Sequence, residues 1–412
     1  MSTLFDSYTA PIPPVRRDVQ IIPVEDPGRE LLLFFDSMKY VKPGFALNRS
    51  VEPALSLLDG RRSLNEIKPF FGNGTEEKQI LEFIQMLDEQ LLLESSYFYD
   101  ETEKVEQQFE TLTVREPALA GSSYPETPAE LAAFVDNILT DAQSKETPID
   151  DTVTKALYAP HIDLRVGDNE YGQAFSTLKE LKPRRIVILA TSHYSGYYPK
   201  MYNGTPFIGS EKSYKLPGRI LHPDREALNL LSENGKASGF TTHDRAHRVE
   251  HSIETHLLFA SQIWKHNFNI VPILVGSLDE LFYKQNGDSG NKLNLFTQQL
   301  RELDSDNTFF LISGDLSHVG QKFGDSDPAR LMRPDVEAFD LEFINSAVEN
   351  NSDRMFQHVA RKYDPYRICG FPPLYTFLKA FPELKGQRIN YQWWDESERE
   401  SAVSFGSIAY SD

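Results

Sequence analysis

The chain has a single cysteine and no long hydrophobic run. Cys369 stands alone among 412 residues, so no intramolecular disulfide can form, as is usual in a reducing compartment. No stretch of about 18 apolar residues is present to span a bilayer. The first residues also lack the basic and then apolar layout of a signal peptide. These absences predict a cytoplasmic protein that does not bind a membrane.

Positive charge is scarce as well. Lys and Arg number 42 against 61 Asp and Glu, which gives a formal net charge of −19, and no long basic run occurs. Nonspecific binding to nucleic acid depends on basic side chains that neutralise phosphates. We therefore expect no nucleic acid as a partner.

Motifs of several common enzyme classes are also missing. The chain has no P-loop and no G-x-G-x-x-G fingerprint after a predicted strand. It also lacks the G-x-S-x-G elbow of α/β hydrolases. The sequence thus gives no indication of nucleotide binding or of serine hydrolase chemistry.

Three apolar, β-forming segments are present, and each leads into a histidine. The segments and their histidines are 155–160 with His161, 185–192 with His193, and 308–313 with His318. Predicted helices alternate with such strands through most of the chain, which favours an α/β fold with a mainly parallel sheet and flanking helices. The carboxyl ends of parallel strands share one edge of a sheet, where active sites form. We therefore expect the three histidines to lie together.

Asp315 stands three residues before His318, so the third segment also supplies a carboxylate. Imidazole and carboxylate are usual ligands of iron, zinc and copper, and they converge at about 2 Å from the ion. Asp315 and His318 also suit a general acid and base pair. The alternative is that hydrogen-bonded histidines merely close the sheet edge, but equivalent positions on three segments favour a site.

Two further features leave alternatives open. Cys369 is either a small buried hydrophobe or, beside the cation of Arg367, a thiolate able to bind metal or react. His247 and His251 would share a helical face only if a helix extended back to His247, and a loop fits equally well. Two glutamates four residues apart, Glu250 and Glu254, are expected on a solvated face.

The predicted elements divide the chain into four parts. Residues 1–29 are proline-rich and are expected to form an extended arm, and residues 30–99 a small α+β module. Residues 100–117 are acidic and are expected to be a linker or exposed helix. The α/β domain is expected over 118–412, with a polar connector at 144–151.

The module resembles the PqqD-like winged-helix domain, a peptide-recognition module found beside radical-SAM enzymes. The likeness lies in residues 54–67, with their Leu-Leu-Asp-Gly-Arg-Arg-Ser-Leu run, and in residues 83–92. It implies that a peptide docks on an edge strand by β-augmentation. The alternative is a small helical lid used only for packing.

The large domain resembles the Memo family, whose bacterial and archaeal members are called AmmeMemoRadiSam system protein B. The motifs that carry the likeness are 120–125, 159–161, 191–193, 250–254, 271–276, 313–318, 368–370 and 404–409. The resemblance implies a fold like the class III extradiol dioxygenases, with an iron or copper site at the sheet edge. The metal ligands it implies are His161, His193, Asp315, His318 and Cys369.

The resemblance also places His251 at this pocket, so His251, Asp315 and His318 are the expected catalytic residues. Two positions depart from the family pattern. Ile162-Asp163-Leu164 replaces the Ala-Gly-Tyr that usually follows the first histidine, and Tyr194 stands where a second histidine is common. We therefore expect a bulkier and more acidic pocket wall.

Two functions are consistent with these features. The first is a metal-dependent enzyme with redox or oxygenase-like chemistry, working with a radical-SAM partner. The chain itself has no cysteine triplet to hold an iron–sulfur cluster. The second is a non-catalytic adaptor, in which the pocket binds metal or a phosphopeptide and the N-terminal module recruits a peptide.

Overall fold

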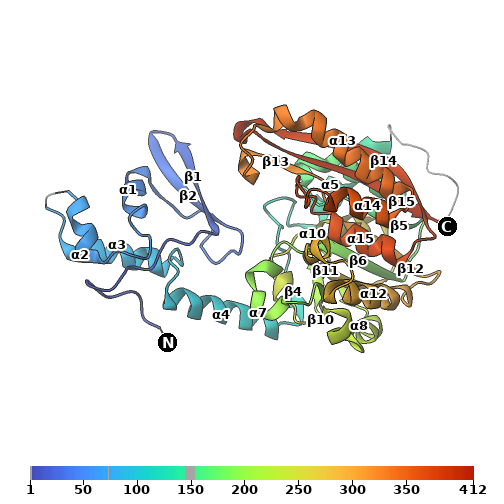
Figure 1. Cartoon of the computed structure of the whole chain (residues 1–412), viewed down its shortest axis with the longest axis horizontal. Coiled ribbons are helices and arrows are strands. Elements are labelled where there is room, and N and C mark those ends of the chain that lie inside the picture. Colours follow the sequence, from blue (N-terminus) through green and yellow to red (C-terminus); the bar gives the residue numbers. More distant parts are fainter. Residues whose placement is uncertain (1, 73, 144–153) are drawn as a thin grey trace. The chain divides into compact units, whose positions relative to one another are not determined.

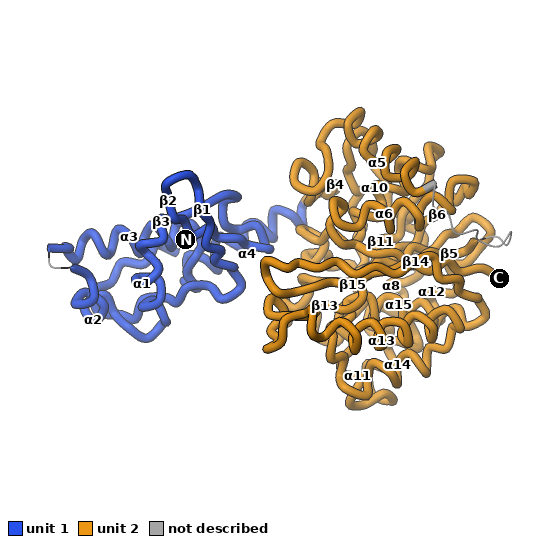
Figure 2. The backbone as a smooth tube through the Cα atoms, turned by 90° about the horizontal axis from the view of Figure 1, so that it is seen from above, with its two compact units in different colours: residues 1–111 blue, residues 112–412 orange. Residues whose placement is uncertain are grey.

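The computed structural model describes residues 2–72, 74–143 and 154–412. The chain divides into two compact units, residues 1–111 and residues 112–412, which are coloured separately in Figure 2. The connector predicted at 144–151 lies outside the described residues. Each unit is described by itself.

Unit 1 (residues 1–111) combines a small antiparallel sheet with helices. The strands are β1 (Val19–Asp26), β2 (Arg29–Asp36) and β3 (Ala46–Asn48), paired in that order. The helices are α1 (Glu52–Leu55), α2 (Leu64–Ile67), α3 (Glu77–Glu89) and α4 (Ser96–Thr111). The amide of Ser63 donates to Glu66 Oε2 at 2.8 Å, as part of a capping box that starts α2. The assignment of this unit as a winged helix stays a prediction.

The boundaries of the N-terminal arm and the linker differ from the predicted ones. Within the expected arm, β1 pairs with β2 along its whole length, because Gly28 (φ 78°) supplies the left-handed residue of a tight turn. Within the expected linker, α4 packs as part of unit 1, and its buried Glu106 accepts from Tyr40 Oη at 2.6 Å. Residues 100–111 are thus helical, which is one of the two alternatives expected for this stretch, and the helix belongs to unit 1.

Unit 2 (residues 112–412) is a mixed α/β unit around a large sheet (Figure 1). The main path of the 12-stranded sheet runs β13-β15-β5-β12-β6-β11-β9-β8-β4, with β14 beside β15 and β7 and β10 off the path. The strands are β4 (Val114–Arg115), β5 (Thr154–Ala159), β6 (Arg185–Thr191), β7 (Phe207–Gly209), β8 (Ser213–Leu216), β9 (Arg219–Pro223), β10 (Phe240–Thr241), β11 (Asn269–Val275), β12 (Thr308–Ser313), β13 (His318–Gly320), β14 (Lys385–Glu396) and β15 (Ser401–Ser411).

The central strands are parallel and covered on both faces. β5, β12, β6, β11 and β9 pair in parallel, as predicted from the alternation of elements. Alternate residues of β6 enter different cores: Val187 and Leu189 one, Ile186 and Ile188 the other. Burial on both faces explains why these strands read as continuous apolar runs.

Helices form the outer layers. The core on one face takes side chains from α8 (Arg225–Ser232), α11 (Glu280–Tyr283), α12 (Asp288–Arg301), α13 (Ala329–Val348), α14 (Ser352–Ala360) and α15 (Phe371–Ala380). The core on the other takes them from α5 (Pro128–Gln143), α6 (Leu164–Ser176) and α10 (Ser252–Ile263). The short helices α7 (Pro199–Tyr202) and α9 (Gly235–Ser238) complete the unit. In the described part of the chain, no helix combines the length and apolarity needed to cross a membrane.

The carboxyl ends of β5, β6 and β12 meet at one edge, as the sequence predicted. Gly314 lies just after β12. Its amide donates to the carbonyl oxygen of Ala159, the last residue of β5, at 3.1 Å. A Cβ atom on Gly314 would lie 2.2 Å from Gly370 Cα, so two chain segments touch here as bare backbone. This contact brings the residue before Gly370, which is Cys369, to the sheet edge.

Candidate metal centre

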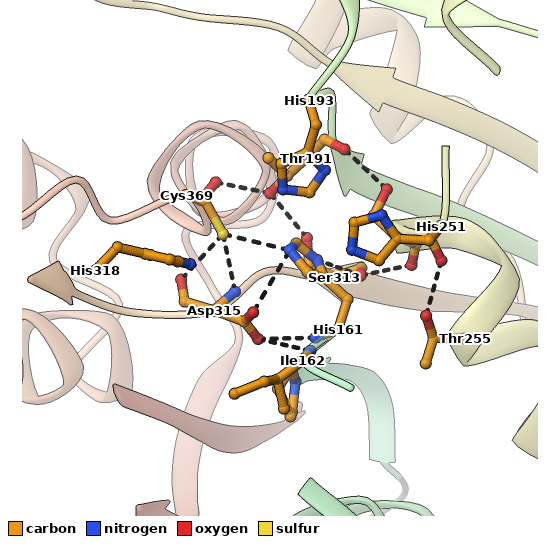
Figure 3. A network of polar contacts seen from close by, with 12 residues as sticks. His161, Ile162, Thr191, His193, His251, Thr255, Ser313, Asp315, His318 and Cys369 are labelled. Atoms are coloured by element: carbon orange, nitrogen blue, oxygen red, sulfur yellow. Dashed lines mark hydrogen bonds and ion pairs between the residues drawn. The ribbon is translucent and has the colours of Figure 1, made fainter. Parts of the chain in front are cut away.

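Side chains from five segments converge at this edge (Figure 3). His161 follows β5, His193 follows β6, and His251 is the residue before α10. The ring centroid of His161 lies 4.9 Å from that of His193 and 5.3 Å from that of His251. The loop after β12 adds Asp315, and the turn before α15 adds Cys369.

Two overlapping sets of donor atoms result. The imidazole group comprises His161, His193 and His251, and the mixed group comprises His161, Asp315 and Cys369. Within each group the donor atoms all lie within 4.8 Å of one another. His161 belongs to both groups, so it is the centre of the arrangement.

Hydrogen bonds fix the tautomer of His161. Ser313 Oγ donates to the carbonyl of Ser252 at 2.7 Å, which uses its only proton. His161 Nδ1, 3.1 Å from Ser313 Oγ, must therefore be the donor in that pair. The lone pair of His161 Nε2 is left to face Cys369 Sγ at 3.4 Å and Asp315 Oδ2 at 3.7 Å.

Glu250 organises the other two histidines. Its Oε1 accepts from His193 Nδ1 at 2.9 Å and lies 3.3 Å from His251 Nδ1. Glu250 also accepts from the amide of His193 through Oε2 at 2.8 Å, and from the amide of His251 through Oε1 at 2.9 Å. A carboxylate that holds Nδ1 of a histidine directs its Nε2 lone pair towards a metal position.

The prediction that Glu250 and Glu254 lie on a solvated face is wrong, because both are buried. Glu254 accepts from Arg115 Nη1 at 2.5 Å and from Tyr124 Oη at 2.6 Å. Arg115 also donates to the carbonyl oxygens of His247 and Glu250. This buried ion pair ties residues of the expected linker to the start of α10.

Backbone groups position the mixed group. Asp315 Oδ1 accepts from the amides of His161 and Ile162, at 2.9 and 3.1 Å. The amide of Asp315 lies 3.2 Å from Cys369 Sγ, and the amide of Gly370 donates to Asp315 O at 2.8 Å. Of the two interpretations of Cys369, this position at the donor set favours the reactive or metal-binding one.

His318 belongs to neither group of donor atoms. Its Nδ1 donates to the carbonyl oxygens of Leu316 and Arg367, at 3.0 and 3.1 Å, which leaves Nε2 as the acceptor. Its role as a ligand or catalytic base stays a prediction. His247 does not pair with His251: it lies in a 3-10 turn, where its ring contacts Tyr214 Oη and Ile208 O.

The charges of the histidines differ sharply. Burial lowers the pKa of His161, and the neighbouring imidazoles lower it further. Burial also lowers the pKa values of His251 and His318, each to about 4. Burial also acts to lower the pKa of His193, but Glu250 and Cys369 outweigh this effect and raise the pKa well above its ordinary value. Of the imidazoles described here, His193 is the one whose pKa is raised.

The acids of the two groups shift in opposite directions. Burial raises the pKa of Glu250, but His193 and His251 outweigh it and hold it below its ordinary range. Burial raises the pKa of Asp315 to about 6 and also raises that of the Cys369 thiol. Glu250 is thus ionised at neutral pH, whereas burial favours the thiol form of Cys369 and the neighbouring His193 opposes this effect.

Glu250, Ser313 and His256 are positioning residues that sequence reasoning missed. His256, buried on α10, uses Nε2 to bond the carbonyls of Ala159 and Pro160, at 3.2 and 2.9 Å, just before His161. Glu250 and Ser313 both lie inside motifs that carried the family resemblance. Position in those motifs was therefore the available signal.

Fold and site together define an α/β protein with a candidate metal centre at the carboxyl edge of parallel strands. The family model described as Memo-like protein matches residues 115–410, so the chain belongs to the Memo family. A MEMO1 family protein of Aquifex aeolicus is 28% identical over 369 residues, which cover 86% of this chain and 90% of that protein. Protein MEMO1 of Xenopus laevis and of Homo sapiens are each 27% identical over 283 residues, covering 67% of this chain and 87% of theirs.

These matches differ in extent. Coverage of 86% is more than residues 112–412 alone could supply, so the Aquifex aeolicus match extends into unit 1. Coverage of 67% is within the length of unit 2. The family assignment itself rests on unit 2.

Proposed function

We propose that this chain is a metal-dependent oxidoreductase that holds iron or copper at the imidazole and mixed groups. The observation that carries the proposal is the fixed tautomer of His161, whose Nε2 lone pair faces Cys369 and Asp315. If His161 served only to close the sheet edge, its unprotonated Nε2 would not need to face other potential metal ligands.

The donor set fits such an ion. Ligands at about 2.0–2.3 Å from one ion lie roughly 3–4.5 Å apart. Donor atoms within 4.8 Å therefore need only small side-chain movements in either group. Imidazole suits iron, copper and zinc, and thiolate favours Cu(I) and iron over Mg²⁺.

The bound ion would supply Lewis acidity and one-electron redox chemistry. The protein contributes the proton-transfer groups around it. Asp315, with a pKa of about 6, can gain or lose a proton near neutral pH. His318 offers an unprotonated Nε2, and His251 is held by Glu250, so these three stay the proposed catalytic residues.

Metal analysis of the purified chain tests the proposal. We expect iron or copper in the wild-type protein and little in a His161→Ala/His193→Ala double variant, since the double substitution removes donors from both groups. Equal metal content in the two proteins would contradict the metal site. A metal-loaded protein that consumes neither oxygen nor thiols would favour the adaptor function instead.

A peptide-docking role for unit 1 is a second proposal, and an apolar groove supports it. The groove, of about 600 Å³, is lined by residues that include Val51, Leu57, Phe70 and Phe83, and Phe70 is 68% exposed. Within the described residues, β1 pairs only with β2, so no further strand lies on its other edge. The expected ligand is a peptide handled by a radical-SAM enzyme.

A random peptide library probed with the full-length chain tests this role. We expect capture of apolar peptides by the wild-type protein and by His161→Ala, with loss in Phe70→Ser. Equal capture by Phe70→Ser and the wild-type protein would contradict docking at this groove.

A further inference from the structure

A buried carboxylate outside both donor groups contacts the loop between β12 and β13. Asp340, on α13, is 0% exposed. Its Oδ1 accepts from Ser317 Oγ at 2.6 Å, and its Oδ2 accepts from Ser404 Oγ at 2.5 Å and from Tyr391 Oη at 3.0 Å. These hydrogen bonds join α13 to β14, to β15 and to the loop that precedes His318.

The directions of the hydrogen bonds around Asp340 follow from its charge. Burial raises the pKa of Asp340 to about 6, and the three hydroxyl donors oppose that rise. The group is therefore mostly ionised at neutral pH. An ionised carboxylate has no proton to donate, so each of the three hydroxyl groups must donate to it.

Ser404 connects this carboxylate to the backbone of the loop. Its single hydroxyl proton goes to Asp340, so its oxygen can only accept in its other hydrogen bond, which comes from the amide of Ser317 at 2.9 Å. The amide of Ser404 also donates to the carbonyl oxygen of Ser317 at 2.9 Å. Both backbone groups of Ser317 are therefore held by Ser404.

The same peptide unit accepts a hydrogen bond from the ring of His318. The amide of Ser317 and the carbonyl of Leu316 belong to one planar peptide unit. His318 Nδ1 lies 3.0 Å from that carbonyl oxygen, which can only accept, so Nδ1 carries the proton of the neutral ring. A chain of three hydrogen bonds thus runs from His318 Nδ1 through the peptide unit and Ser404 Oγ to Asp340.

Hydrogen bonds in such a chain polarise one another. A group that donates to a carboxylate becomes a better acceptor, and the effect passes along the chain to the next donor. A partner that accepts from Nδ1 of a histidine fixes the tautomer of the ring and makes its Nε2 more basic. Glu250 does this for His193 directly, through a hydrogen bond of 2.9 Å. Asp340 is placed to do it for His318 over a longer path.

A second buried carboxylate provides an internal comparison. Glu170, on α6, is 0% exposed and accepts from Ser407 Oγ and Gln392 Nε2. Ser404 and Ser407 are three residues apart on β15, so they face opposite sides of the sheet. Glu170 and Asp340 therefore hold β14 and β15 from opposite faces. Neither of these partners of Glu170 lies in the loop between β12 and β13, so contact with that loop distinguishes Asp340.

We propose that Asp340 is a positioning residue of the metal centre, which fixes the tautomer and direction of the His318 ring through Ser404 and the peptide unit between them. The inference rests on the proposed function, in which His318 transfers protons beside the ion. It adds a supporting carboxylate that neither donor group contains. The alternative is that Asp340 only fastens α13 to the sheet, as Glu170 does for α6.

Nitrogen NMR of the histidine rings in the metal-free, full-length protein tests the proposal. The His318 signal is identified by its absence in His318→Gln. In the wild-type protein we expect a single tautomer with hydrogen on Nδ1 and slow exchange of that hydrogen with water. Asp340→Asn removes the charge and Ser404→Ala removes the connection, so each should give a mixture of tautomers and exchange that is about tenfold faster or more.

Matched controls lie on the opposite face of the same strands. Glu170→Gln and Ser407→Ala make the same chemical changes and should lower stability by a similar amount, but they should leave the His318 ring as in the wild-type protein. Asp340→Asn/Ser404→Ala should change the ring no more than either single substitution, because both act on one path.

The outcomes decide between the two roles of Asp340. An unchanged His318 ring in Asp340→Asn or in Ser404→Ala would overturn the proposal, and so would an equal change in Glu170→Gln. The two substitutions break the chain at different points. If one variant does not fold, the result from the other therefore decides.

The metal content of the same samples separates this proposal from the proposed function. Asp340 belongs to neither donor group, and the NMR measurement needs no metal. A change of the His318 ring in Asp340→Asn would support the hydrogen-bonded chain even if the wild-type protein bound no iron or copper. Metal in a wild-type protein whose His318 ring does not respond to Asp340→Asn would leave the centre standing and reject the chain.

Discussion

The two donor groups share His161 but are held in place by different means. In the imidazole group, one buried carboxylate, Glu250, bonds the side chain and the amide of His193 and contacts His251. In the mixed group, backbone amides bond Asp315 and the Sγ of Cys369, and His193 is the charged neighbour of that sulfur. The first group therefore depends on electrostatics, and the second on the close packing of chain segments at Gly314 and Gly370.

This difference has chemical consequences. Three imidazoles with a charged supporting carboxylate suit Fe(II), Cu(II) or Zn(II), whereas a thiolate favours Cu(I). Because His161 belongs to both groups, an ion bound to its imidazole would be held either by the other imidazoles or by the carboxylate and the thiolate. Substitutions that affect one group and spare the other can therefore show which of them holds the ion.

The largest effect is expected from His161→Ala. Removing the shared donor damages both groups at once, so we expect metal affinity to fall by about 100-fold or more. The metal-dependent rise in melting temperature should disappear with it, because a ligand bound only to the folded state stabilises that state. Isothermal titration and thermal melts with and without metal measure both effects.

His222→Ala is the matched control for this substitution. His222 is exposed on β9 and belongs to neither group. Its variant should bind metal and melt as the wild-type protein does. Metal affinity in His161→Ala within about threefold of the wild-type value would mean that neither group is the site.

A smaller and selective effect is expected when the groups are separated. Cys369→Ser should reduce Cu(I) affinity by roughly 10- to 100-fold and Fe(II) affinity much less, because thiolate is a soft ligand. His251→Ala should reduce Fe(II) affinity more than Cu(I) affinity, since it removes an imidazole and leaves the thiolate. Competition titrations with a chelator for each ion give both ratios. Identical losses in the two variants would show that the groups act as a single site.

The strands and the histidines of this centre could be predicted from the sequence. The buried carboxylates that hold the histidines in place could not. An apolar run buried on both faces is visible locally, and the residue after it must lie at the sheet edge. Glu250 and Glu254 looked like an exposed pair because their partners are remote. His193 lies 57 residues from Glu250, and Arg115 lies 139 residues from Glu254. Pairing over such separations is decided by the tertiary fold.

The boundaries of the two units were misplaced for a related reason. The proline-rich stretch was interpreted from its composition, which does not distinguish a free arm from a paired strand. The acidic stretch was expected to be a linker or an exposed helix, and the structure has a helix there. The pairing of β1 with β2 and the hydrogen bond between Tyr40 and Glu106 depend on the tertiary fold of unit 1. Cys369 remained ambiguous because the contact between Gly314 and Gly370 joins distant segments.

Glu250→Gln tests the electrostatic support of the imidazole group. Glutamine can still accept from His193 Nδ1, but it carries no charge to hold the imidazoles. We expect metal affinity to fall by about tenfold, at the lower end of the effect of residues that orient ligands. The pKa of His193 should fall at the same time, because Glu250 is the charge that raises it. NMR titration of the His193 ring follows that shift.

Glu226→Gln is the control, since Glu226 lies exposed in the first turn of α8. It should change neither quantity. If Glu250→Gln leaves the His193 titration unchanged, the carboxylate does not provide the support that its distances indicate.

The smallest effect is expected from pH, and it belongs to the mixed group alone. The pKa of Asp315 is raised to about 6, so its carboxylate is charged above that pH and neutral below it. A metal ion competes with this proton, which makes binding weaken as the pH falls from 7 to 6, by about twofold from Asp315 itself. Asp315→Asn keeps an oxygen that accepts from the amides of His161 and Ile162 but does not titrate. The loss of metal affinity between pH 7 and pH 6 should therefore be about twofold smaller in Asp315→Asn than in the wild-type protein. The histidines titrate in both proteins, so their effect cancels when the two losses are compared. The same pH dependence in both proteins would show that Asp315 does not contact the ion and that the imidazole group binds it alone.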